Sequence, residues 1–121
     1  MQEEELPIQR PVTGDFPYDW AIKNLYDVEN PYRKGIKNGV AKMYDNRTLG
    51  AGVDVKSGHP ELYNRAKKYG LKLKEADDVA YEHIQHDADV IRNNYADIYG
   101  KDAADTLSLG PLFLLAQARY Q

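Results

Sequence analysis

Apolar residues recur at helical spacing through the second half of the chain. Between Lys74 and Tyr99 they step by three or four positions, which marks one face of a 3.6-residue repeat. A shorter helix is predicted between Pro60, which is tolerated in a first helical turn, and Gly70, which is favoured just after a helix end. Gly100 is suited to end the long helix.

The last segment, from Leu112 to Tyr120, is apolar nearly all round. Such a pattern is typical of a helix that is buried on most sides. A single neighbouring layer cannot cover such a helix. We therefore expect this segment either to self-associate or to bind a partner chain.

The first part of the chain is less periodic and richer in turn-forming residues. Residues 1–14 carry three consecutive Glu, two Pro and a Gly without any repeat. This composition indicates a flexible N-terminal arm, either extended or disordered. Asp15 is a suitable N-cap and Pro17 is tolerated in a first turn, so a helix is predicted from there to about Glu29. The Asn-Pro pair that follows ends this helix.

A small antiparallel sheet is predicted after the first helix. Asn38-Gly39 is a strong signal for a two-residue hairpin turn, and it precedes a short run from Val40 to Tyr44. A second run, from Arg47 to Val55, is interrupted by two glycines. Two or three strands of this length do not form a stable sheet alone. The order of helix, small sheet and further helices indicates the α+β class, with one domain over residues 15–121.

Composition narrows the classes of function. The 121 residues include 16 Lys plus Arg, 19 Asp plus Glu and no Cys, for a formal charge of −3. A mildly acidic chain without a dense basic cluster is a poor candidate for binding nucleic acid. The lack of Cys excludes a disulfide framework, a zinc knuckle and a thiol nucleophile. No apolar run approaches the ~18 residues that cross a bilayer, and the acidic N-terminus does not resemble a secretory signal, so we expect a soluble protein without a membrane partner.

The most informative single residue is Glu29. It follows Tyr18, Ile22 and Leu25 at steps of four, three and four positions, so its carboxyl group falls on the core-facing stripe at the end of the first helix. Desolvation and the negative end of the helix dipole both disfavour a charged carboxylate there. A carboxylic acid that stays partly protonated near neutral pH is what a general acid requires. The alternative is that Glu29 lies past the last buried turn and merely solvates the helix end.

A second group of polar and flexible residues lies between Tyr44 and Asp54. Its two glycines, two positions apart, would let the backbone bend or pass close to a ligand. Asp45 would supply a second carboxylate opposite Glu29, and Thr48 would hold a water molecule. An ordinary hairpin with polar turn residues is the other interpretation of this segment.

Taken in order, these elements resemble the phage-type lysozymes (muramidases). The shared pattern is a helix that ends in Glu, a small sheet with Tyr, Asp and a Thr-Ile-Gly-x-Gly-like strand, a long helix with Asp near its middle, and an apolar helix. The matching segments here are Val28-Glu29, Tyr44-Asp45, residues 48–52, residues 76–89 and residues 112–120. The resemblance covers residues 16–121 and implies a lysozyme-like α+β domain whose C-terminal lobe is incomplete. A separate chain or a downstream fragment would then complete that lobe.

Two departures from the family pattern concern the second acid. Glu29 and Asp45 are sixteen positions apart, which implies extra residues around Tyr32 to Gly39. Asp45 also lies only three positions before Thr48. The acid that pairs with Glu29 is therefore either Asp45 or Asp54.

The resemblance implies a glycoside hydrolase that cleaves the glycan strands of peptidoglycan without a cofactor, as an endolysin or a virion-associated muramidase. Glu29 would protonate the glycosidic oxygen, Asp45 would stabilise the oxocarbenium charge or help to orient a water, and Thr48 would position that water. The candidates for substrate binding are Tyr32, Tyr44 and Asp54. Such a protein would lie in the host cytoplasm before release to the cell wall, or in the phage virion. The alternative is a catalytically inactive lysozyme-like structural or binding domain of a phage particle or cell-wall assembly.

Two further groups of polar residues lie on the predicted helices. His83 and His86 are three positions apart, but two His on one helix supply too few ligands, so no metal site is expected. Four lysines are interpreted as charges at helix ends: Lys67, Lys68, Lys72 and Lys74. Their alternative role is to attract an anionic cell-wall polymer.

Overall fold

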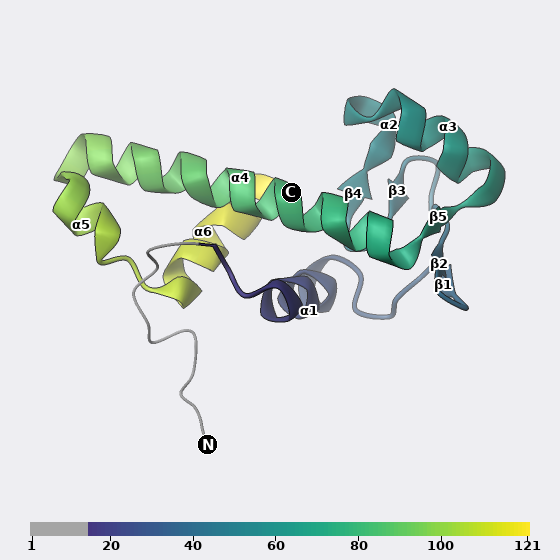
Figure 1. Cartoon of the computed structure of the whole chain (residues 1–121), viewed down its shortest axis with the longest axis horizontal. Coiled ribbons are helices and arrows are strands. Elements are labelled where there is room, and N and C mark those ends of the chain that lie inside the picture. Colours follow the sequence, from purple (N-terminus) through teal and green to yellow (C-terminus); the bar gives the residue numbers. More distant parts are fainter. Residues whose placement is uncertain (1–14) are drawn as a thin grey trace, which may run out of the picture. The chain divides into compact units, whose positions relative to one another are not determined.

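Residues 15–121 are described by the computed structural model, and they combine α-helices with short antiparallel strands in an α+β fold. Figure 1 shows the elements in chain order. The described chain forms two compact units, one of residues 18–82 and the other of residues 15–17 with 83–121. The N-terminal arm predicted for residues 1–14 lies outside the described residues.

The first helix, α1 (Tyr18–Glu29), begins slightly later than its predicted N-cap at Asp15 and ends where predicted. Its buried face carries Ala21, Ile22, Leu25 and Tyr26. The backbone N–H of Asn30 donates to the carbonyl of Tyr26 at 2.9 Å, and the chain then turns away before Pro31. Glu29 is thus the last helical residue, and it is half-buried.

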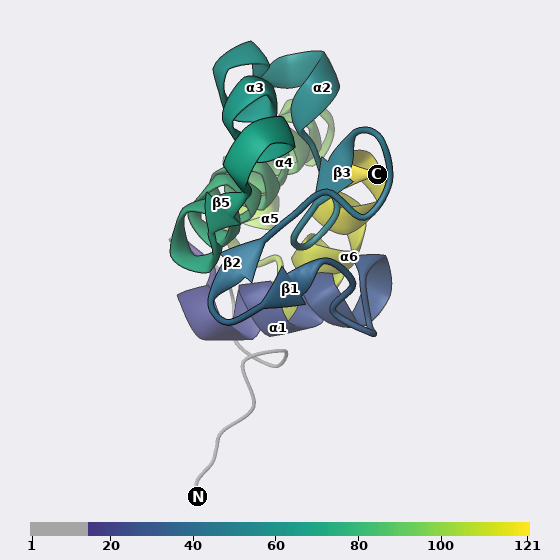
Figure 2. The same cartoon turned by 90° about the vertical axis from the view of Figure 1, so that its right-hand side faces the viewer.

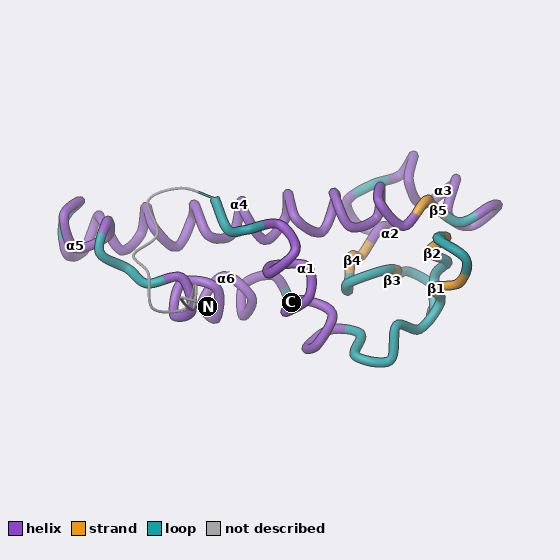
Figure 3. The backbone as a smooth tube through the Cα atoms, turned by 60° about the horizontal axis from the view of Figure 1, so that its bottom comes forward, coloured by secondary structure: helices purple, strands orange, loops and turns teal. Residues whose placement is uncertain are grey.

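Five two-residue strands form two separate antiparallel sheets (Figure 3). The three-stranded sheet has the order β1 (Ile36–Lys37), β2 (Val40–Ala41) and β5 (Leu71–Lys72), and the two-stranded sheet pairs β3 (Thr48–Leu49) with β4 (Val53–Asp54). The predicted Asn38-Gly39 turn joins β1 to β2, with φ of 54° and 76°, the left-handed values that such a turn needs. Strand β5 was not predicted, because it exists only through its pairing with β2.

The unit of residues 18–82 also contains two whole helices and the start of a third. They are α2 (Val55–Gly58), α3 (Pro60–Tyr69) and α4 (Leu73–Tyr99), the last of which continues into the other unit. Helices α2 and α3 lie side by side (Figure 2). The predicted bounds of α3 and α4 are confirmed to within one residue, since Pro60 opens α3, Gly70 follows it with φ of 81°, and α4 starts one residue before Lys74.

The other unit contains the rest of α4 together with α5 (Lys101–Asp105) and α6 (Leu109–Tyr120). Helix α6 starts before Gly110-Pro111 rather than after this pair, because proline is tolerated in a first helical turn. The helix buries one face, which carries Leu112, Phe113 and Ala116. Its opposite face is apolar but exposed, with Leu114 64% and Leu115 47% accessible to solvent. None of the helices in residues 15–121 has the length and apolar character needed to cross a membrane.

Candidate functional site

Glu29, at the end of α1, lies against the turn between β3 and β4. A Cβ built on Gly52 would lie 2.8 Å from Glu29 Cβ and 3.1 Å from Glu29 Oε1. Gly52 also has φ of 87°, a conformation that favours glycine. The glycine therefore lets the backbone of the turn approach the carboxyl group of Glu29. The approach of a ligand to these glycines stays a prediction.

Asn30 connects the end of α1 to the same turn. Its side chain is buried, with 4% exposure, and its Nδ2 donates to the carbonyl oxygens of Gly50 at 3.0 Å and Lys34 at 3.1 Å. Its Oδ1 accepts a hydrogen bond from the Lys34 backbone N–H at 2.9 Å. These bonds fix the residue next to Glu29 and hold the start of the turn between β3 and β4, residues 50–52, which we call the glycine turn. Sequence reasoning missed this role, because the pairing with Gly50 spans twenty positions and leaves no local pattern.

The other side of the glycine turn contacts α1 and the start of α4. A Cβ on Gly50 would lie 3.5 Å from both Ala76 Cβ and the Tyr26 hydroxyl oxygen. The Tyr26 hydroxyl donates to Asp77 Oδ1 at 2.7 Å. Burial raises the pKa of Asp77, the nearby Asp78 charge adds to this, and the Tyr26 hydrogen bond opposes it. The turn is thus packed between the two helices that the Tyr26–Asp77 hydrogen bond joins.

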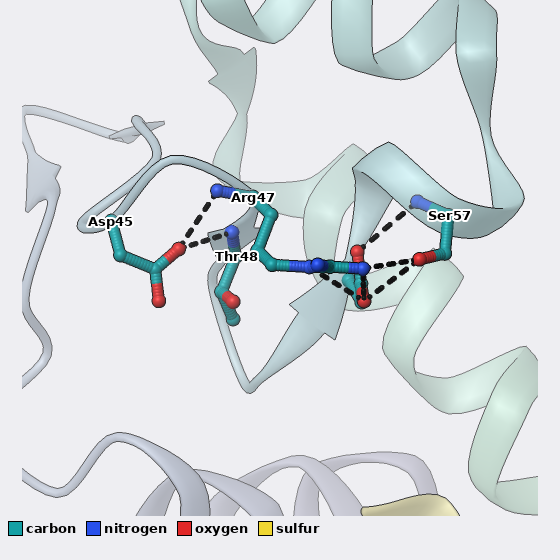
Figure 4. Close-up of polar contacts among 5 residues, drawn as sticks. Asp45, Arg47, Thr48 and Ser57 are labelled. Atoms are coloured by element: carbon teal, nitrogen blue, oxygen red, sulfur yellow. Dashed lines mark hydrogen bonds and ion pairs between the residues drawn. The ribbon is translucent and has the colours of Figure 1, made fainter.

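Asp45 and Thr48 lie together at the start of β3 (Figure 4). Asp45 Oδ1 accepts hydrogen bonds from the backbone N–H groups of Arg47 at 2.8 Å and Thr48 at 2.7 Å. The Arg47 N–H first, and then the N–H and hydroxyl of Thr48, hold the pKa of Asp45 below its usual range. The side chain of Asp45 is exposed, so this charged carboxylate faces solvent.

Asp54, the competing second acid, has a different environment. Its Oδ2 accepts from Arg47 Nε at 3.0 Å and Nη2 at 2.7 Å, and its Oδ1 accepts from the Ser57 backbone N–H at 3.2 Å. The hydrogen bond from Arg47 is the main cause that lowers the pKa of Asp54. Arg47 also contacts the Ser57 hydroxyl (Figure 4). Both oxygens of Asp54 are thus engaged in joining β4 to α2, where Asp54 is the N-cap.

Tyr44 is affected by the charges of both Glu29 and Asp45. Desolvation raises the pKa of this half-buried Tyr, and the negative charges of Asp45 and Glu29 raise it further. The side chain of Tyr44 is therefore within electrostatic reach of both carboxyl groups, although they come from different elements. Tyr32 is 84% exposed and stacks on no ring among residues 15–121, so its contact with a sugar remains a prediction.

Gly52 thus lies against Glu29, Thr48 binds Asp45, and Tyr44 is the residue that both acids affect. Residues 15–121 contain no group of three or more His, Asp or Glu that could hold a metal ion. The His83 ring packs edge-on against Tyr120, with ring centres 6.5 Å apart. Comparison with known proteins finds no matching family model, no matching curated protein and no matching solved structure. A functional assignment therefore depends on the chemistry of residues 18–82.

Proposed function

We propose that this protein is a lysozyme-type glycoside hydrolase that cleaves the glycan strands of peptidoglycan. The observation that carries the proposal is the approach of Gly52 to Glu29, which sets a half-buried carboxyl group against the glycine turn of a small sheet. The order of α1, short sheets and the long helix α4 agrees with the lysozyme-like pattern seen in the sequence. Peptidoglycan as the substrate follows from that resemblance.

In the proposed reaction, Glu29 is the general acid. It donates its proton to the glycosidic oxygen while the bond between that oxygen and the anomeric carbon breaks. The bonding electrons leave with the oxygen, so the sugar ring develops positive charge. The packing of Gly52 and the hydrogen bonds of Asn30 would hold the acid in one place during this step.

Asp45 is the second acid in this proposal. Its low pKa keeps the carboxylate negative at neutral pH, which suits it to stabilise the positive sugar or to orient a water. Thr48, whose backbone N–H bonds Asp45, would position that water through its hydroxyl group. We favour Asp45 over Asp54 because the oxygens of Asp54 are held by Arg47 and Ser57.

The first experiment is to incubate the protein with purified peptidoglycan and measure new reducing ends. Reduction with borohydride, followed by sugar analysis, identifies which amino sugar carries the new end. New muramic acid ends are expected for a muramidase. Binding to peptidoglycan without any new ends would instead support an inactive domain that binds the cell wall, and the absence of both would contradict the proposed hydrolase.

A further inference from the structure

Three lysines lie on the outer face of the three-stranded sheet, one in β1, one in β5 and one directly after β2. Lys37 of β1 is in register with Val40 of β2, and Val40 is in register with Lys72 of β5, so these three side chains share one face. Lys42 lies on the same face, since a Cβ on Gly70 would touch both Val40 Cγ1 at 2.8 Å and Lys42 Cγ at 3.1 Å. We call Lys37, Lys42 and Lys72 the lysine face.

The opposite face of this sheet points into the unit of residues 18–82. Ala41 and Leu71, which are in register with each other, are 0% and 2% exposed. The alternation of side chains along a strand therefore directs the three lysines outward, and all three are exposed. The lysine face cannot rotate into the core without exposing Ala41 and Leu71.

The positive charges of the lysine face are not balanced by ion pairs. Among the described residues, no carboxylate lies within ion-pair distance of Lys37, Lys42 or Lys72. The nearby acid Glu75 is bound by Arg65 through two hydrogen bonds of 3.1 and 2.7 Å, and Lys72 adds only a weaker electrostatic effect. The face therefore keeps a net positive charge that an external anion could balance.

This charge extends along the chain that leads into the sheet. Lys67 and Lys68 occupy the last turn of α3, and only Tyr69 and Gly70 separate them from β5. Residues 18–82 contain twelve Lys plus Arg against ten Asp plus Glu, whereas the whole chain has net charge −3. The positive charge is thus concentrated in the unit that carries Glu29.

We propose that the lysine face binds a linear polyanion with repeating phosphodiester groups and no bases, such as a polyol-phosphate polymer of a cell wall. Strands two apart lie roughly 10 Å from each other, so Lys37 and Lys72 would engage separate phosphates of one chain. The register positions of the face are Lys37, Val40 and Lys72, so Val40 and not an aromatic residue lies between the two lysines. Tyr69, beside β5, is exposed and its ring carries the Lys68 ammonium 5.2 Å from its centre, so the comparison with oligo-dT tests whether bases stack there. The polymer source rests on the proposed function, because such polymers occur in the same walls as the glycan substrate.

The test uses a fluorescent oligomer of poly(glycerol phosphate) and measures its anisotropy with wild-type protein, and again with Glu29→Gln. Wild-type protein should bind with an affinity that falls as salt is added. For three phosphate contacts the fall is about 20-fold between 50 and 200 mM salt, by the relation for flexible single strands. Replacing Lys37, Lys42 and Lys72 together with Gln should weaken binding at least about 10-fold and lower the salt slope by about two.

The matched control replaces Lys23, Lys56 and Lys101 with Gln, which removes the same charge from sites outside the lysine face. Lys23 and Lys101 form i,i+4 ion pairs with Asp27 and Asp105. The control should keep most of the affinity and nearly all of the salt slope. If the triple lysine-face variant does not fold, each single variant should lower the slope by about 0.7.

Three outcomes would overturn the inference: no binding at 50 mM salt, equal loss in the lysine-face and control variants, or tighter binding of oligo-dT than of the polyol phosphate. Because the Glu29→Gln protein is also used, polymer binding is measured separately from hydrolysis. Binding without glycan cleavage would leave the lysine face in place and remove the proposed function. Cleavage of polymer-free peptidoglycan without polymer binding would do the reverse.

Discussion

Replacing Gly52 with alanine tests how closely the turn between β3 and β4 holds the carboxyl group of Glu29. The new Cβ would lie 2.8 Å from Glu29 Cβ, whereas carbon atoms in contact are normally about 3.5–4.0 Å apart. Crowding of this kind destabilises a protein by about 1–3 kcal/mol. An L-residue at the left-handed φ of Gly52 adds about 1–2 kcal/mol. If Glu29 keeps its place, the free energy of unfolding should fall by about 2–5 kcal/mol.

The Glu29 side chain can also relieve the crowding by rotating away from the turn. The loss of stability would then be smaller, but the carboxyl group would leave the position from which it protonates the glycosidic oxygen. Misplacing a catalytic group by about 1 Å can slow a reaction by about 100-fold. Gly52→Ala should therefore lower stability, cleavage or both.

Gly39→Ala is the matched control. Gly39 has a similar φ of 76°, but no atom lies within 4 Å of the position that its Cβ would take. This variant carries the backbone strain without the crowding, so its stability loss should be smaller by about 1–3 kcal/mol when Glu29 stays in place. Urea unfolding measures the stability of both variants, and release of reducing ends from peptidoglycan measures their activity. Equal stability together with equal cleavage in the two variants would refute the close contact between Gly52 and Glu29.

The remaining predictions concern Asn30, the partly buried Asp77 and the exposed face of α6. Asn30→Ala removes three hydrogen bonds of a buried amide. The free energy of unfolding measured in urea should therefore fall by about 2–4 kcal/mol. An unchanged value would mean that these bonds do not form. Asp77→Asn keeps an oxygen that accepts from Tyr26 but cannot ionise. The folded state raises the pKa of Asp77, so folding is favoured while this carboxyl group is protonated. This contribution to stability is complete below the unfolded pKa of about 4 and is lost as pH rises through the pKa of the folded state. The variant should therefore gain stability relative to wild type over that pH range, and parallel pH profiles would argue against the burial of Asp77. We also propose that the protein self-associates through the exposed Leu114 and Leu115. Sedimentation at micromolar concentration should show an oligomer for the wild-type protein and a monomer when both leucines are replaced with Gln. A monomeric wild-type protein would contradict this proposal.

Local patterns were enough to predict α1, α3 and α4, whereas the short helices α2 and α5 were not predicted. The bounds of α3 follow from Pro60 and Gly70, and α4 follows from an apolar spacing that persists for its full length. Strand β5 could not be predicted, because Leu71 and Lys72 become a strand only by pairing with β2. The start of α6 was misplaced because Gly110-Pro111 looks like a break, although both residues fit a first helical turn.

The candidate site shows the same division between local and long-range information. The position of Glu29 at the end of α1 follows from the spacing of apolar residues along one helix. The hydrogen bonds of Asn30 to Gly50 depend on a loop twenty positions away, so the sequence revealed Asn30 only as a residue that ends a helix. Our preference for Asp45 over Asp54 could not come from the sequence, because it depends on where the Arg47 side chain lies.

The rate of glycan cleavage by Glu29→Gln tests the proposed general acid most directly. Glutamine keeps the size of the side chain but has no transferable proton, so the release of reducing ends should fall by about 100-fold or more, while folding and peptidoglycan binding persist. Glu61→Gln, which changes an exposed acid of α3, should cleave at the wild-type rate. A Glu29→Gln protein that cleaves peptidoglycan as fast as wild type would contradict the proposed mechanism.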